Sequence, residues 1–217
     1  MKLNEAGRLF DEALRKAPRN LTLLIYKADV LALANRWQDV ETILGSLLFQ
    51  TDLSSGTRAV LLACQIKAFL RQENQERARS MVESFLNHQP SLLEKLYLLD
   101  QLSCVPFMDG LRGCLPDAET WSEQALRLQP ESLTLKGTRG AILVEQGKNS
   151  EGEVLLKEVY DKGEADVDKG VASLFLALCA KRRGDLECAN RLAKRARLIH
   201  LVPWLLKRIE SEFGKAP

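Results

Sequence analysis

One spacing of side chains recurs along this sequence and constrains the fold more than any other feature. A small residue, a bulky residue four positions later and a second small residue three positions after that occur as Ala6, Phe10 and Ala13. Seven residues make nearly two turns of an α-helix, so these three side chains lie on one helix face. Pro18 then ends the helix because it cannot continue the backbone hydrogen bonding. The spacing predicts helices that approach one another closely through small side chains.

Further copies of this frame follow along the chain. Two clear copies begin at Ala78 and Ala118, and three weaker copies begin at Val40, Gly152 and Ala189. A residue that tolerates a turn lies five positions before the first small residue of each internal copy, at Asn35, Glu73, Gly113, Gly147 and Gly184. We expect each of these residues to close one helix and open the next. Ser91 with Glu94, and Ser150 with Glu153, fit the capping box of a helix N-terminus.

The residues between these frames are also typical of helices. Leu and Ala dominate the apolar residues, and Glu, Lys, Arg and Gln dominate the polar ones, all of which favour helix. Few stretches alternate apolar and polar residues with the period of a strand. The sequence therefore predicts an all-α fold without a β-sheet.

The alternation of two helices, with a Pro after the second, resembles the tetratricopeptide repeat, a helix–turn–helix unit of about 34 residues. The resemblance covers almost the whole chain, although the Trp typical of the first helix is missing and the later repeats are longer. It implies a right-handed α-α superhelix, a solenoid in which stacked pairs bury a continuous core. It also implies a role in binding other proteins.

We expect one repeat domain over residues 1–217. It begins with an N-terminal half-repeat at residues 1–18 and ends with a capping helix at residues 203–213. Between them lie five helix pairs, at residues 21–50, 56–89, 91–129, 132–163 and 168–200. Pro106 should break the first helix of the third pair. The half-repeat either packs as a cap or belongs to a longer protein, and its missing partner helix favours the second alternative.

The first helices of such arrays line a concave groove, so the resemblance also implies a binding surface. The candidate groove residues are Ile25, Asp29, Ala63, Lys67, Leu70, Ala141, Val144, Val171, Leu174, Leu178 and Lys181. This register could shift by one position, and helix packing alone could bury the apolar members. If the groove is open, Leu174→Glu with Leu178→Glu should abolish partner binding without loss of helicity.

The groove lacks the Lys, Arg and Asn clamp with which some members of the family grip a terminal carboxylate. The matching positions hold Ile25 and Asp29, Gly137 and Ala141, and Val171 and Phe175. An apolar groove is better suited to an amphipathic helix or an apolar peptide. A cochaperone role that depends on the clamp is therefore disfavoured.

Other residue types give little sign of a catalytic or metal centre. The chain has two histidines, and its five cysteines show no zinc spacing, so we expect no enzyme, cofactor or metal site. Free thiols are typical of a reducing compartment and predict a cytoplasmic protein. No apolar run is long enough for membrane insertion.

The net charge of +2 gives no reason to expect nucleic acid as a partner, but the charges are unevenly distributed. Residues 181–217 hold ten Lys or Arg against four acids, and residues 151–168 hold seven acids against two Lys. These segments are either solvated helix faces or, for the basic one, a surface that docks on an acidic partner.

Our leading hypothesis is a scaffold that binds a partner peptide or helix in an apolar concave groove. The alternative is a regulatory or oligomerising segment of a larger enzyme or membrane-associated protein. Self-association is a third possibility.

Overall fold

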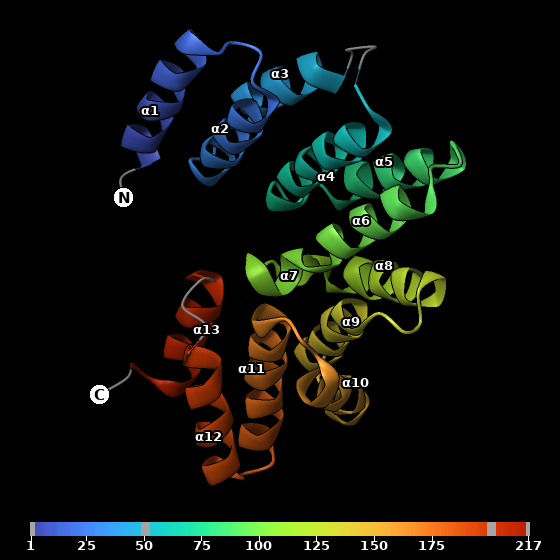
Figure 1. Ribbon diagram of the computed structural model, residues 1–217, viewed down its shortest axis with the longest axis vertical. Coiled ribbons are helices and arrows are strands. Elements are labelled where there is room, and N and C mark those ends of the chain that lie inside the picture. The colour runs from blue at the N-terminus through green and yellow to red at the C-terminus, as the bar shows by residue number, and fades with distance from the viewer. Residues whose placement is uncertain (1–2, 49–52, 199–202, 216–217) are drawn as a thin grey trace. The chain divides into compact units, whose positions relative to one another are not determined.

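The computed structural model describes residues 3–48, 53–198 and 203–215, and all regular structure in these ranges is helical (Figure 1). The all-α prediction is confirmed. The handedness of the superhelix stays a prediction.

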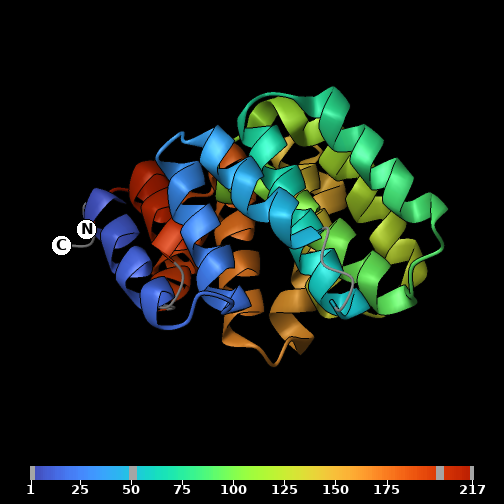
Figure 2. The ribbon, with the colours of Figure 1, turned by 90° about the horizontal axis from the view of Figure 1, so that it is seen from above.

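The chain divides into two compact units, Met1–Leu98 and Leu99–Pro217, whereas the sequence predicts one repeat domain. Unit 1 contains α1 to α5 and the start of α6, at Leu3–Lys16, Leu21–Leu33, Trp37–Leu48, Ser55–Arg71, Gln75–Asn87 and Leu92–Ser103. Within this unit, each of α1 to α4 packs beside the helix that follows it in the sequence, as Figure 2 also shows.

Unit 2 begins within α6. Its remaining elements are α7, the short 3-10 turn η1, and α8 to α13, at Val105–Met108, Arg112–Cys114, Leu115–Leu128, Leu133–Glu145, Asn149–Lys162, Asp166–Arg182, Leu186–Arg197 and Pro203–Phe213. The helices α9 and α10, and α11 and α12, form closely packed pairs.

Polar side chains fix the start of several helices. Five residues accept a hydrogen bond from the backbone N–H three positions later, namely Asn20, Ser54, Asn74, Ser132 and Asp185. The capping box of Ser91 and Glu94 is present, because the Glu94 carboxylate accepts the backbone N–H of Ser91 at 2.8 Å. The box predicted at Ser150 is wrong: α10 begins at Asn149, and Glu153 pairs with Arg183.

The turns within the helix pairs require a left-handed backbone residue. Asn35 and Glu73 have φ of 58°, and Gly147 and Gly184 have φ of 84°, as the sequence predicts. The prediction for Gly113 is wrong, because this residue lies in η1 and Gly110 takes the positive φ of 75°.

A break near Pro106 interrupts the first helix of the third pair, as expected. α6 ends at Ser103, and α7 runs only from Val105 to Met108, with Pro106 in its first turn. Proline is tolerated there because the first N–H groups of a helix have no intrahelical partner. The short α7 places Phe107 in the core of unit 2.

The small residues of the recurring frame lie in the core. Ala78, Ala118, Ala125 and Ala193 are each 1% exposed or less. Such residues allow neighbouring helix backbones to come close, so the spacing found in the sequence is a packing pattern.

Candidate interaction surfaces

The first helices of unit 1 present a partly accessible face. Ile25, Asp29 and Lys67 from the predicted groove are half-buried, whereas Ala63 and Leu70 are buried. Further accessible side chains lie one position after some of the predicted residues.

On α2, Tyr26 is 55% exposed and Leu33 is 58% exposed, whereas Ala32 is buried. On α4, Cys64 and Arg71 are half-buried. The predicted register therefore holds at Ile25, Asp29 and Lys67, while Tyr26, Leu33, Cys64 and Arg71 add to the accessible surface. We call the resulting surface the unit 1 face, and it comprises Ile25, Tyr26, Asp29, Leu33, Cys64, Lys67, Arg71 and Tyr97.

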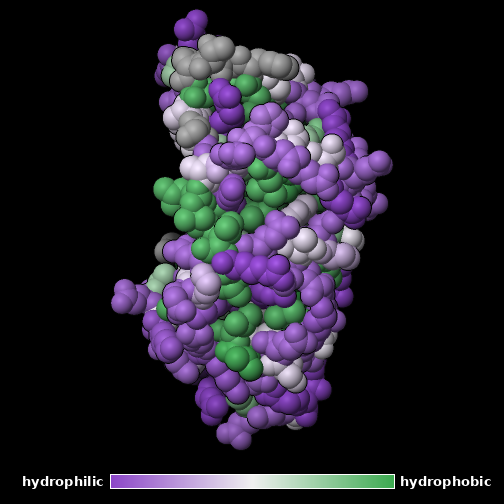
Figure 3. Space-filling model, turned by 90° about the vertical axis from the view of Figure 1, so that its right-hand side faces the viewer, coloured by the Kyte–Doolittle hydropathy of each residue, from purple (hydrophilic) through white to green (hydrophobic). Residues whose placement is uncertain are grey.

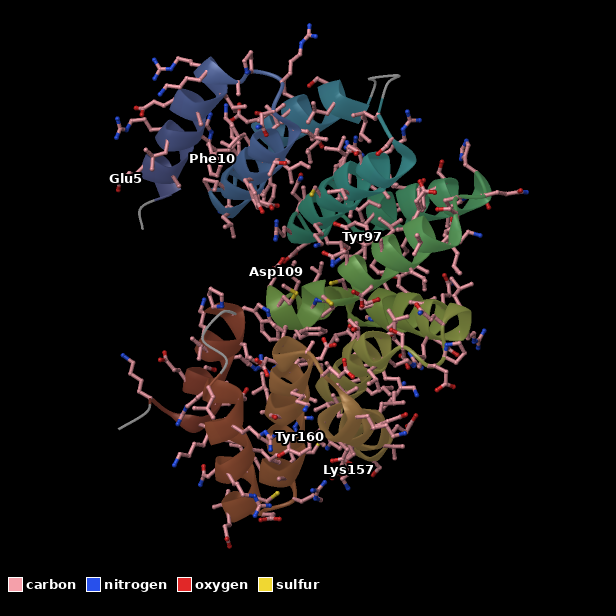
Figure 4. All side chains as sticks on the ribbon, in the orientation of Figure 1. Glu5, Phe10, Tyr97, Asp109, Lys157 and Tyr160 are labelled. Carbon is pink, nitrogen blue, oxygen red and sulfur yellow. The ribbon has the colours of Figure 1, made fainter. Side chains whose placement is uncertain are left out.

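In the unit 1 face, side chains on different helices shift one another's pKa values. The pKa of the Cys64 thiol is raised to about 11, mainly by burial and then by the carboxylate of Asp29, while Lys67 and Arg71 oppose the change. The pKa of Tyr97, a residue of α6 labelled in Figure 4, is also raised, mainly by burial and then by Cys64 and Asp29. Side chains of α2, α4 and α6 thus share one environment, with an acid, two cations and a neutral thiol.

The predicted groove residues of unit 2 are placed differently. Ala141, Val144, Leu174 and Leu178 are 3% exposed or less and belong to the core of this unit. The alternative that packing buries them is correct, and no open apolar groove exists at these positions. Leu174→Glu with Leu178→Glu would place two charges in the core, so loss of helicity is the expected result.

One outer member of the same set, Lys181, contacts α13. Lys181 is exposed, and its Nζ donates to the backbone carbonyl of Glu212 at 2.6 Å and lies 5.2 Å from the ring centroid of Phe213. Val171 is half-buried and packs against the core. Lys181, Leu178 and Leu174 follow one another at helical spacing, so α13 lies along this face of α11.

Two more contacts tie α13 to other helices. The guanidinium of Arg208 donates to the Glu145 carboxylate of α9 at 3.0 Å, and the Glu145 side chain is only 3% exposed. The ring of Trp204 lies 5.5 Å from the ring of Phe107 of α7, which also contacts Phe175. In Figure 1, α13 lies beside α7 and one end of α11. The chain's own last described helix therefore packs on the α11 side of the groove predicted for this unit.

Comparison with known proteins supports this arrangement of helices. No protein-family model and no curated protein matches the sequence. A solved structure does match: the crystal structure of a tetratricopeptide repeat protein from Parabacteroides merdae ATCC 43184 aligns with a TM-score of 0.65. The alignment covers 95% of this chain and 77% of that chain, at 17% sequence identity.

The chain has a tetratricopeptide repeat fold. The resemblance noted in the sequence is thereby confirmed at the level of the fold. Helical repeats of this kind generally mediate contacts between proteins, through the extended surfaces that their stacked pairs create.

Opposite charges partly neutralise each other within the repeats of unit 2. Glu153, from the acidic segment, pairs with Arg183 of the basic segment at 2.5 Å. Arg195 donates to the Tyr160 hydroxyl at 2.8 Å and also lies over its ring. These contacts support the interpretation of both segments as packed and solvated helix faces.

A hollow of about 610 Å³ shares no lining residue with the unit 1 face. Apolar side chains form most of its wall, at Leu48, Leu53, Leu62, Met81, Phe85 and Pro90. Near it, in the first turn of α6, Leu93 is 79% exposed. Figure 3 shows hydrophobic patches among hydrophilic side chains on the face seen from the right-hand side of Figure 1.

Three structural observations bear on the other expectations from the sequence. All five cysteines are free thiols. In the described ranges, no three His, Cys, Asp or Glu side chains are grouped so that they could hold a metal ion. None of the helices that the structure describes has the length and apolar character to span a bilayer.

Proposed function

We propose that this chain is a protein-interaction scaffold and that its unit 1 face binds a peptide segment of another protein. The observation that best supports the proposal is the exposure of Tyr26, Leu33 and Tyr97, at 55%, 58% and 38%. Aromatic residues are enriched among the energetically important residues of protein interfaces, because they bury a large area at a small cost in conformational entropy. These three side chains lie on first helices, which line the groove in arrays of this fold.

The charges of the unit 1 face define the ligand further. Lys67 and Arg71 supply two cations and Asp29 supplies one carboxylate, so the face carries an excess of positive charge. A matching peptide presents apolar side chains to Tyr26, Leu33 and Tyr97, together with at least one acidic group. Electrostatic complementarity of this kind increases specificity and the association rate more than the affinity itself.

The experiment compares three forms of the whole chain: the wild type, Leu33→Glu with Tyr97→Ala, and Leu9→Glu as the control. Leu9 is 51% exposed on α1, in the same unit and outside the unit 1 face, so it matches Leu33 in residue type and exposure. Proteins captured from lysate are identified by mass spectrometry. Peptides from a captured protein are then titrated against the three purified forms.

We expect the double variant to bind such a peptide at least about tenfold more weakly, a loss of about 1.4 kcal/mol, while Leu9→Glu binds like the wild type. Circular dichroism checks that helicity is unchanged. Equal peptide affinity in all three folded forms would exclude the unit 1 face as the binding site. The regulatory or oligomerising role remains a prediction from the sequence alone.

A further inference from the structure

The contacts of α13 resemble those of a bound helical ligand. Its apolar side chains recur at helical spacing: Leu205 and Ile209 are fully buried, and Trp204 and Phe213 pack against the same core. Polar contacts lie around this apolar centre, where Arg208 pairs with Glu145 and Lys181 pairs with Glu212. A buried apolar centre with aromatic and arginine anchors and a polar rim is typical of a protein interface.

The length of α13 makes its conformation dependent on docking. It has eleven residues, and an isolated helix of this length is marginal in water. Its terminal turn is also held from outside, because Arg197 of α12 donates to the backbone carbonyls of Phe213 and Gly214. Helices of this kind open locally at a smaller free-energy cost than the whole domain.

The fit of α13 leaves one polar atom without a partner. The Nε atom of Arg208 is buried and makes no hydrogen bond within the described residues. An unsatisfied buried donor is unfavourable. A helix whose cation at this position leaves no donor unpaired would therefore bind the same face more tightly than α13.

We infer that the face formed by α7, α9, α11 and α12 is a helix-binding site, that α13 is its resident occupant, and that an amphipathic helix of another protein with the same pattern replaces it. In α13 this pattern is Trp204, Leu205, the cation Arg208 and Ile209. A matching helix has the same residue types at the same spacing. This extends the proposed scaffold role to unit 2, and because the two sites use different residues, each proposal is tested by its own variants.

The probe is a fluorescein-labelled peptide with the sequence of residues 203–215, titrated against the full chain by fluorescence polarisation. In the wild type, α13 competes at high effective concentration, since it is tethered to its own site. Trp204→Ala removes the contact with Phe107 and weakens α13 in the chain. We expect this variant to bind the peptide at least tenfold more tightly than the wild type.

Two controls make the result specific. Lys207 is exposed on α13, so Lys207→Ala should bind the peptide like the wild type. A peptide with Arg208→Glu should bind the Trp204→Ala chain at least tenfold more weakly than the unaltered peptide, because Glu145 would repel it. Equal binding of both peptides, or no binding to a folded Trp204→Ala chain, would overturn the inference.

Two further measurements remain decisive even if Trp204→Ala does not fold. In wild-type hydrogen exchange, amides of α13 should exchange faster than those of α9 and α11, through local opening. Exchange of all three helices at one common rate would show that α13 is an inseparable part of the core and would contradict the proposal. Light scattering should give a monomer mass, and a dimer formed by exchange of α13 between copies would identify the occupant as a second copy instead.

Discussion

At the scale of single residues, the turn inside each helix pair depends on a left-handed backbone conformation. Gly147 and Gly184 adopt it with φ of 84° and without a Cβ clash. Asn35 and Glu73 occupy the same place in unit 1 and carry side chains there. Asn tolerates this region comparatively well, whereas Glu does not. Glu73 is thus a position where sequence and backbone are in conflict.

We predict that Glu73→Gly raises the free energy of unfolding of unit 1 by about 1 kcal/mol, because Gly removes the clash between Cβ and backbone. Glu76→Gly is the control. This residue lies in the first turn of α5, where Gly should lower stability by up to about 1 kcal/mol. Urea unfolding followed by circular dichroism measures both. If both substitutions lower the free energy of unfolding, the left-handed conformation of residue 73 does not limit the stability of unit 1.

At the scale of helices, the close approach of α9 and α10 depends on two glycines. A Cβ on Gly152 would lie 2.7 Å from the carbonyl oxygen of Gly140 and 2.8 Å from a methyl group of Val144. A Cβ on Gly140 would lie equally close to the Leu156 side chain. The two helices would have to move apart to make room.

Gly152→Ala should therefore lower the melting temperature, although Ala favours helix over Gly by about 1 kcal/mol. We expect a net loss of about 1–2 kcal/mol, because overpacking of a tight contact costs about 1–3 kcal/mol. Gly45→Ala is the matched control in α3, where an added Cβ meets nothing within 4 Å and should raise stability. A higher melting temperature for both variants would mean that the α9–α10 contact adapts without strain.

The helices and their packing faces could largely be predicted from the sequence, because both depend on local spacing. The small residues at helical intervals indicated which faces meet, and Pro106 indicated the break after α6. Exposure was harder to predict. Leu174 and Leu178 have the spacing of groove residues, but α13 packs on their helix from about thirty positions further along the chain. On α2 the predicted Ile25 is half-buried and the next residue, Tyr26, is exposed, and both are large and largely apolar, so composition could not decide between them.

At the scale of the whole molecule, each compact unit has a hydrophobic cluster of its own. One contains Leu44 and Leu61 from α3 and α4, and the other contains Leu156 and Leu174 from α10 and α11. Within each unit, a helix contacts mainly the helices next to it in the sequence. Stability in repeat folds is close to a sum of repeat and nearest-neighbour terms, so damage in one core should remain local.

Leu44→Ala tests this locality, because Leu44 is fully buried and its truncation should cost about 2–5 kcal/mol. In hydrogen exchange measured by mass spectrometry, we expect amides of α2, α3 and α4 to lose protection, while those of α11 keep wild-type rates. Leu9→Ala, at a half-exposed position of α1, should change protection little. An equal loss in α11 would show that both cores unfold as one cooperative unit, and nearest-neighbour additivity would then fail for this chain.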